Sequence, residues 1–445
     1  MRLFVNCYLL LLVACLAVYL PSLWNGFQLG WDDQWYVMNR YTEDGFTQAN
    51  LRAVFTDFYY GQYSPVNVLA NMAMYAAFGY KPFVFHLYSL LLHIACCFLL
   101  FAFLSRMGAI FNCTLCENPL RSLLVHVRLD FAAFAATLLF AIHPLQVESI
   151  CWISAAKIPL YTLFTLLAMF AYLRYVRAGK MLFYFAAFGC FLLAFGSKEQ
   201  AIALPALLLL LDWALGRHRS AEGKNNWMQL IFEKLPFILF AIFAALYTRS
   251  HQSMEYTAQV AGYPLWQRLV FACYSLVVYA GRFALPANLL YVYPFPMPPG
   301  DALPAQYFVY PVVVAAGVYL LFLYFRKIPR VVVFGLLFYL VNMALVLHIV
   351  PMSRFMITAD RYVYLGSAGL FFIAAWYTVP WLQKVAAAGK KWIFAVVACY
   401  LLYLGGYAHV RSYAWKDSDT VKKDLWELIE KNKEGKHEPD NDEDI

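Results

Sequence analysis

Long apolar runs constrain this chain more strongly than any other feature of its sequence. A transmembrane helix needs about 20 consecutive, mostly apolar residues, and most of these runs approach that length. Hydrophobic residues make up 63% of the 445 residues and charged residues only 13%, whereas soluble domains carry roughly a quarter charged residues. The sequence therefore predicts an all-α integral membrane protein with eleven transmembrane helices, in the runs 3–21, 83–105, 130–147, 151–173, 182–197, 200–215, 232–248, 309–325, 331–350, 363–382 and 392–409.

Basic residues between the runs predict the orientation, because cytoplasmic loops carry an excess of Lys and Arg. Placing every basic cluster inside makes the N-terminus cytoplasmic and the C-terminus periplasmic or otherwise extracytoplasmic. If 265–285 also crossed the membrane, the later basic clusters would face the outside. We therefore expect a juxtamembrane or re-entrant helix there. Two large extracytoplasmic loops result, 22–82 and 249–308. The clusters are Arg106/Arg121/Arg128, Arg174/Arg177/Lys180, Arg217/Arg219/Lys224/Lys234, Arg326/Lys327/Arg330 and Lys384/Lys390/Lys391.

The chain divides into a predicted membrane domain, 1–415, and a short extracytoplasmic tail, 416–445. The apolar residues of 417–433 share one face of a short amphipathic helix, and 438–444 is acidic and predicted to be disordered. The tail holds 6 Lys and 11 Asp or Glu, a charge of −5, so the net charge of +8 leaves +13 for the rest. This excess of base fits membrane topology and lipid contact. A nucleic-acid partner would need aromatic residues beside a basic groove, and the sequence has no such pattern.

The ten cysteines form no pattern typical of a disulfide framework. Cys113 and Cys116 make one CxxC motif in a polar loop, without the second pair that a zinc site needs. The others lie in or beside apolar runs, where cysteine behaves as a small hydrophobe; they are Cys7, Cys15, Cys96, Cys97, Cys151, Cys190, Cys273 and Cys399.

Two adjacent carboxylates, Asp32 and Asp33, follow the first apolar run. A carboxylate close to lipid is costly unless it is solvated, paired or used in function. We therefore expect both residues to be catalytic, and they are the ligands for a divalent metal if one is bound. In the structural alternative, one of them caps a short helix and the other faces water.

Two further outer junctions carry charged residues. His143 precedes a proline at a helix end, and Glu148 lies at the following turn. Lys157 either extends outward to water or faces the bundle and binds an anion. Lys198 and Glu199 interrupt two apolar runs at a tight hairpin, where they either pair with each other or support a site.

A last polar group precedes the run at 363–382. Arg354 and Arg361 suit a phosphate, which arginine grips with two parallel hydrogen bonds. Asp360 and Tyr362 flank Arg361, with an Asp360–Arg361 ion pair as the structural alternative.

Carboxylates and cations at matching depth are what transfer from a lipid phosphate requires. A carboxylate takes the proton of an acceptor hydroxyl. Cations then stabilise the departing phosphate. The predicted phosphate-binding residues are Arg361, Lys198, Arg354 and Lys157, supported by His143, Glu148, Glu199, Asp360 and Tyr362.

The ordered set of these motifs resembles the GT-C fold glycosyltransferases that use polyprenyl-phosphate sugars. It is most similar to the transmembrane and tetratricopeptide-containing O-mannosyltransferases and their bacterial relatives. The resemblance covers nearly all of 1–415. It rests on Trp31-Asp-Asp33, Tyr63-Ser-Pro-Val66, Phe85-His-Leu-Tyr-Ser-Leu-Leu-Leu-His93, His143-Pro-Leu-Gln-Val-Glu148, Ser197-Lys-Glu199 and Ala359-Asp-Arg-Tyr-Val-Tyr364.

The resemblance implies an inverting sugar transfer from a polyprenyl-phosphate donor to a hydroxyl of a protein Ser or Thr, a glycan or a lipid. Asp32 would be the general base with Asp33 beside it, and Arg361 and Lys198 would lie near the donor phosphate. It also implies eleven crossings and an outer C-terminus. The chain departs from the family at Ser64, where relatives usually carry Arg, and at 156–158, where they usually carry Arg-Lys-Asp or Arg-Ala-Asp. The tetratricopeptide array is also missing.

Two other functions compete with this one. A lipid or sugar transporter or flippase predicts charges at mid-span and broken helices at related positions in two halves. A non-catalytic membrane scaffold has no need for two acids beside the bilayer. A divalent cofactor is left open, because only a diphosphate donor favours one. Asn112-Cys-Thr114, the one Asn-X-Ser/Thr triplet, lies on the predicted inner side. This favours a bacterial inner membrane over the endoplasmic reticulum.

Overall fold

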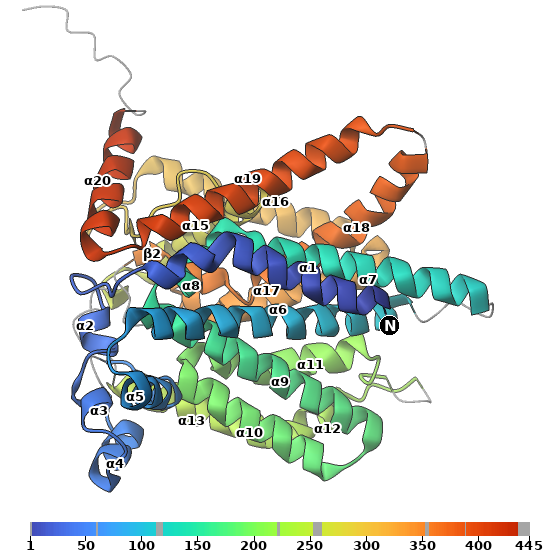
Figure 1. The fold of residues 1–445 in the computed structure, drawn as a ribbon. Coiled ribbons are helices and arrows are strands. Elements are labelled where there is room, and N and C mark those ends of the chain that lie inside the picture. The colour runs from blue at the N-terminus through green and yellow to red at the C-terminus, as the bar shows by residue number, and fades with distance from the viewer. Residues whose placement is uncertain are drawn as a thin grey trace, which may run out of the picture.

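Helices dominate the fold. The computed structural model describes residues 2–58, 61–112, 119–219, 223–251, 260–351, 356–387 and 389–434. Figure 1 shows several long helices lying side by side as a bundle. The main helices are α1 (Arg2–Tyr19), α6 (Pro82–Asn112), α7 (Pro119–Ile142), α9 (Lys157–Ala178), α10 (Met181–Ser197), α11 (Leu204–Ala214), α13 (Leu235–His251), α16 (Val309–Leu323), α17 (Arg330–Met343), α18 (Ser367–Ala387) and α19 (Trp392–Ala414).

Five described helical segments are long and apolar enough to cross a membrane: Val5–Trp24, Pro82–Asn112, Ile153–Ala178, Ala305–Leu323 and Trp392–Ala414. Two bent pairs, with bends of 56° and 62°, raise this number to seven if each pair is one span. The shorter apolar helices Met181–Ser197 and Arg330–Val346 fall below the usual length of about 20 residues. The chain is therefore a helical membrane protein, and its eleven crossings remain a prediction.

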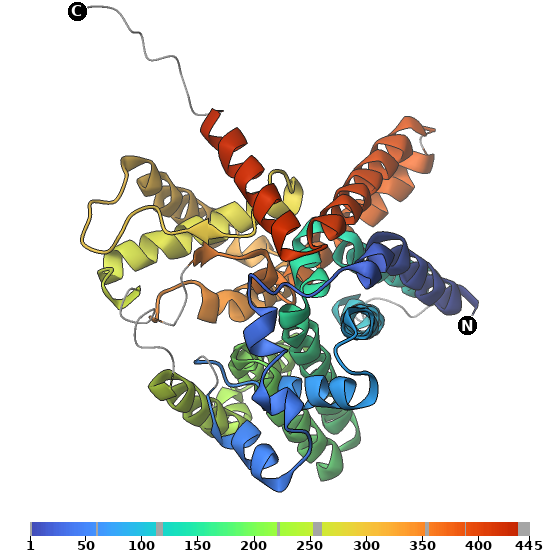
Figure 2. The same ribbon diagram turned by 60° about the vertical axis from the view of Figure 1, so that its left-hand side comes forward.

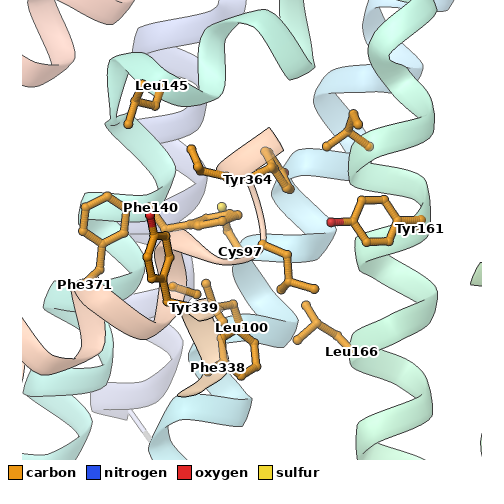
Figure 3. Close-up of a cluster of buried hydrophobic side chains, with 14 of the residues drawn as sticks. Cys97, Leu100, Phe140, Leu145, Tyr161, Leu166, Phe338, Tyr339, Tyr364 and Phe371 are labelled. Atoms are coloured by element: carbon orange, nitrogen blue, oxygen red, sulfur yellow. The ribbon is translucent and has the colours of Figure 1, made fainter. Parts of the chain in front are cut away.

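The bundle is held by close helix packing around an apolar core. Helix α9 packs along α10, and α7 packs against α6 and α18. Aromatic and aliphatic side chains fill the space between these helices (Figure 3). Gly335 of α17 and Gly369 of α18 let two backbones meet: a Cβ at Gly335 would lie 2.5 Å from the Gly369 carbonyl oxygen. Small residues at such crossings are typical of helices that associate in lipid.

Two pairs of elements leave the bundle. The end of α18 and the start of α19 project together from it (Figures 1 and 2), whereas the rest of α18 packs on α7 and α17. Helix α16, which packs on α15 (Leu265–Ala284), has no buried residue. In a membrane protein such an apolar surface faces lipid.

Short elements gather at the end of the bundle away from the N-terminus (Figure 1). They are α2 (Asp33–Tyr36), α3 (Arg40–Glu43), α4 (Gln48–Thr56), α5 (Pro65–Phe78), α8 (Val147–Cys151), α20 (Ser418–Glu434) and the strand β2 (Met356–Thr358). Strand β2 pairs antiparallel with β1 (Tyr293–Pro294). The all-α prediction missed this small sheet, because β1 belongs to a proline-rich segment that is extended and cannot continue a helix.

The tail helix α20 docks on the loop that follows the first span. The Gly26 N–H donates to the Lys416 carbonyl (2.7 Å), and the Gln28 amide donates to the Trp415 carbonyl (2.7 Å). The Gly30 N–H donates to the Ser418 hydroxyl (2.8 Å). Both segments belong to the same end of the bundle as a result. The acidic stretch 438–444 lies outside the described residues.

A buried network of charged side chains lies near the N-terminal end of α10. Lys234, between α12 (Trp227–Glu233) and α13, pairs with Asp212 and lies 3.0 Å from Glu233. Arg217 joins Asp212 (2.6 Å) and Glu233 (2.8 Å). The Tyr172 hydroxyl accepts from Arg217 and lies within hydrogen-bond distance of both acids, 2.7 Å from Asp212 and 2.9 Å from Glu233. Two cations thus balance two carboxylates, and Lys234 is buried within the protein.

Replacing Lys234 with methionine should destabilise the protein strongly. Asp212 and Lys234 are both 0% exposed, and breaking a buried ion pair costs about 3–5 kcal/mol because a buried charge loses its partner. Thermal unfolding in detergent should show a clearly lower midpoint. Lys224→Met, an exposed member of the same basic cluster, is the control and should leave the midpoint unchanged. Equal midpoints for the two variants would contradict this role of the network.

Candidate active site

Asp33 holds the loop after the first span. Its carboxylate is fully buried and accepts hydrogen bonds from the Gln28 N–H (2.7 Å) and the Ser154 N–H (3.0 Å). The Ser154 hydroxyl donates to it as well. Burial raises the pKa of Asp33, and these hydrogen bonds oppose that rise. Its two oxygens are thus occupied by protein donors that hold the loop, and a catalytic role for Asp33 stays a prediction.

Asp32 has a different environment. It occupies the residue before α2 but makes no capping hydrogen bond with its side chain. Burial raises the pKa of Asp32, and the positive charges of Lys157 and Arg361 partly offset that rise. The two adjacent acids therefore differ: Asp33 accepts hydrogen bonds from the backbone, and Asp32 is influenced by the charges of two cations.

Lys157 links the first outer loop to the hairpin after α10. It starts α9, and its ammonium group donates to the Gln62 side chain and lies 4.7 Å from the centre of the Tyr36 ring. Lys198, Glu199, Asp32 and Arg361 all act on it electrostatically. Lys157 therefore turns toward the other charged residues and does not extend away from the bundle.

Lys198 and Glu199 follow α10 directly. The Lys198 ammonium lies 3.6 Å from the Glu199 carboxylate, and Lys198 is only 6% exposed. The contact is the ion pair that the sequence suggested as one alternative. Both charges also act electrostatically on Lys157, in opposite directions: Lys198 disfavours its positive charge and Glu199 favours it.

Arg361 is anchored by Glu148. One carboxylate oxygen of Glu148 pairs with the Arg361 guanidinium, and the other accepts the Arg361 backbone N–H (2.8 Å). The guanidinium also lies 5.2 Å from the centre of the Trp152 ring and 5.1 Å from that of Tyr362. Burial disfavours the charged guanidinium, but Glu148, Tyr362 and Asp32 together outweigh it and keep the pKa of Arg361 above its ordinary value.

Asp360 belongs to a neighbouring cluster and does not pair with Arg361. It lies 3.5 Å from Arg411 and 3.8 Å from Arg282, and it accepts a hydrogen bond from the Tyr293 hydroxyl (3.2 Å). Burial raises the pKa of Asp360 to about 6, against the opposing effect of the two arginines. We had not predicted Arg282 or Arg411 as functional residues. The signal was present, since an arginine in an apolar helix needs a partner.

Two predicted residues, His143 and Arg354, remain to be placed. His143 caps a short turn: its Nδ1 accepts the Leu145 N–H (3.3 Å), and Nε2 lies 3.3 Å from the Phe283 carbonyl. It is a helix-terminal histidine without contact to the other charges. Arg354 lies outside the described residues.

A small pocket lies next to Lys157. Tyr36, Asp57, Gln62 and Ser64 line it, together with residues of α4 and α5. Lys157 donates to Gln62, one of these lining residues. Both positions at which the chain departs from its resemblance, Ser64 and 156–158, are therefore close to the same pocket.

Replacing Asp33 with asparagine should lower stability. The amide of asparagine can accept only on one side, so the N–H of Gln28 or Ser154 loses its acceptor, at about 1–3 kcal/mol for an unsatisfied buried group. We expect a lower unfolding midpoint in detergent and faster proteolysis within 25–31. An unchanged midpoint would contradict the structural role of Asp33.

No family model and no solved structure matches the chain. One similar protein is "Protein O-mannosyl-transferase Tmtc3" of Drosophila melanogaster, 29% identical over 160 residues. The matched stretch covers 34% of this chain and 17% of the relative. This similarity supports a distant, mannosyltransferase-like relation, which agrees with the resemblance of the motifs.

Proposed function

We propose that the protein is an inverting glycosyltransferase that moves a sugar from a polyprenyl phosphate to an acceptor hydroxyl. The observation that supports this most is the environment of Asp32, a carboxylate without a capping role whose raised pKa is partly offset by the positive charges of Lys157 and Arg361. A base beside two cations suits a reaction in which a hydroxyl attacks while a phosphate leaves.

In the proposed reaction, the acceptor oxygen attacks the anomeric carbon of the donor, and Asp32 takes the hydroxyl proton. The new glycosidic bond forms as the bond from the anomeric carbon to the phosphate oxygen breaks, with inversion. The electron pair leaves on the phosphate, where Arg361, Lys157 and Lys198 stabilise the added charge. The raised pKa of Asp32 makes its carboxylate a better base.

Other charged residues position this set. Glu148 fixes Arg361 through two hydrogen bonds, and Glu199 pairs with Lys198. Asp33 holds the loop that presents Asp32. A monophosphate donor can leave with the help of these cations alone, whereas a diphosphate donor would favour a divalent ion. We therefore propose a metal-independent reaction on a monophosphate donor.

The site is proposed to face the extracytoplasmic side, because the basic clusters lie toward the other end of the apolar runs. This places the N-terminus in the cytoplasm. A bacterial inner membrane and the endoplasmic reticulum membrane both present lipid-linked sugars on that side. The acceptor is proposed to be a protein Ser or Thr, or a hydroxyl of a glycan or lipid.

The test is a transfer assay with purified protein in liposomes that contain polyprenyl-phosphate mannose. We expect sugar to reach a hydroxyl acceptor and polyprenyl phosphate to be released, at rates unchanged by added Mg²⁺. Passage of intact donor across the bilayer with no loss of its glycosidic bond would instead identify a flippase. Neither transfer nor release with mannose, glucose or N-acetylglucosamine donors would refute the proposal.

A further inference from the structure

Two cysteines and one histidine meet inside the bundle, apart from the site just described. Cys15 lies on α1, and His93 and Cys97 lie one turn apart on α6. All three are 0% exposed, and their ligand atoms lie within 4.8 Å of one another. Figure 3 shows Cys97 in the apolar core with Tyr364 close by. Among the described residues, this is the one group of three that could hold a metal ion.

The spacing of these atoms fits a single small ion. A tetrahedral zinc ion with Zn–S of about 2.3 Å and Zn–N of about 2.0 Å needs S···S near ~3.8 Å and S···N near ~3.6 Å. The two sulfur atoms lie 3.9 Å apart, and the Cys97 sulfur lies 3.6 Å from His93 Nε2. Two of the three ligand pairs thus have the required spacing, and the fourth tetrahedral position is left to a small ligand such as water.

The histidine is oriented as a metal ligand should be. His93 Nδ1 lies 2.7 Å from the Tyr364 hydroxyl, an outer contact of the kind that fixes the ring of a ligating histidine. Phe140 stacks on the same ring at 5.7 Å. Without an ion, Nε2–H donates to the Ala141 carbonyl (3.2 Å). When an ion takes Nε2, the ring proton resides on Nδ1 and is donated to Tyr364.

Charge balance selects the class of ion. Two thiolates neutralise one divalent cation and the imidazole stays neutral, so the loaded site has no net charge and suits an apolar interior. Sulfur and nitrogen ligands favour zinc and similar ions over Mg²⁺ or Ca²⁺. Binding forms two metal–sulfur bonds and releases the two thiol protons to solvent.

We propose that Cys15, His93 and Cys97 bind one Zn²⁺-class ion that joins α1 to α6. Cysteines that the sequence presents as small hydrophobes are in this case ligands. The proposal does not depend on the proposed function, because it concerns metal content and not sugar transfer.

The test measures zinc in protein purified in detergent through a tag without histidines. The background carries Cys113→Ser and Cys116→Ser, which removes the CxxC motif. We expect about one zinc per chain, and loss of most of it in Cys15→Ser/Cys97→Ser. Cys7→Ser and Cys96→Ser, buried cysteines on the same two helices, are matched controls and should keep it. Cobalt in place of zinc should show thiolate-to-metal absorption that the double variant lacks.

Three results would overturn the proposal. They are a background protein that neither contains zinc nor takes up one equivalent, a double variant that keeps its zinc, or a Cys15–Cys97 disulfide in the purified protein. If the double variant does not fold, His93→Gln carries the test, since it removes one ligand and keeps both sulfurs. Retention of full zinc affinity in His93→Gln would also refute the site.

Discussion

Replacing Asp32 with asparagine is expected to slow sugar transfer by about 10²–10⁴-fold, the range that a positioned general base contributes. The substitution keeps the shape of the side chain and removes only its basicity. Since the Asp32 side chain makes no capping hydrogen bond, the unfolding midpoint should stay unchanged. The measurement is the rate of transfer in liposomes beside thermal unfolding of the same preparation.

The pH dependence of the wild-type protein provides a second readout. Burial raises the pKa of Asp32 above its ordinary value, and only the carboxylate form can accept a proton. Transfer should therefore decline as the pH falls through that raised pKa, and the residual activity of Asp32→Asn should lack this decline.

Asp33→Asn provides the contrast for this variant, because it should lose stability where Asp32→Asn does not. Full activity in both variants would refute a carboxylate base. Full activity in Asp32→Asn alone would assign the base elsewhere.

The sequence predicted that certain residues far apart along the chain lie close together in space. Asp32, Lys157, Lys198 and Arg361 each lie at or near the predicted outer end of an apolar run. Alternating helices bring such ends to one side of a bundle, so their common depth follows from topology alone. The electrostatic contacts of Lys157 and Asp32 match that expectation.

The sequence did not predict which charges pair. Asp360 and Arg361 are adjacent, and an ion pair between them is the structural alternative that the sequence suggests, yet they lie in a 3₁₀ turn, Asp360–Val363. Successive side chains in such a turn point about 120° apart. Asp360 therefore meets Arg282 and Arg411, while Arg361 meets Glu148. Pairings of this kind depend on the packing of helices far apart in sequence.

The different roles of Asp32 and Asp33 also depend on tertiary structure. Only Asp33 reaches the Ser154 N–H and the Gln28 N–H, and neither donor is marked by any local pattern. The span count is limited by another effect. Several runs that hydropathy treats alike form shorter or bent helices, and the bends arise where His143 and Lys234 interrupt the apolar sequence.

Replacing Arg361 with alanine is expected to reduce transfer by about 10²–10³-fold, as for loss of one donor to a developing negative charge. The effect should appear chiefly as weaker donor binding, that is, as a higher donor density needed for half-maximal transfer, because Arg361 is proposed to hold the phosphate. The measurement is transfer rate against the density of polyprenyl-phosphate sugar in the liposomes, at saturating acceptor.

Arg361→Ala also removes the charge opposite Glu148, which is 3% exposed, so a loss of fold must be separated from a loss of phosphate binding. Arg361→Ala combined with Glu148→Gln removes both charges and should restore the unfolding midpoint but not the transfer. Arg361→Lys keeps the charge without the planar fork and should fall between alanine and the wild type. Donor dependence equal to that of the wild type in the folded double variant would exclude Arg361 from the phosphate site and leave Lys157 and Lys198 as its cations.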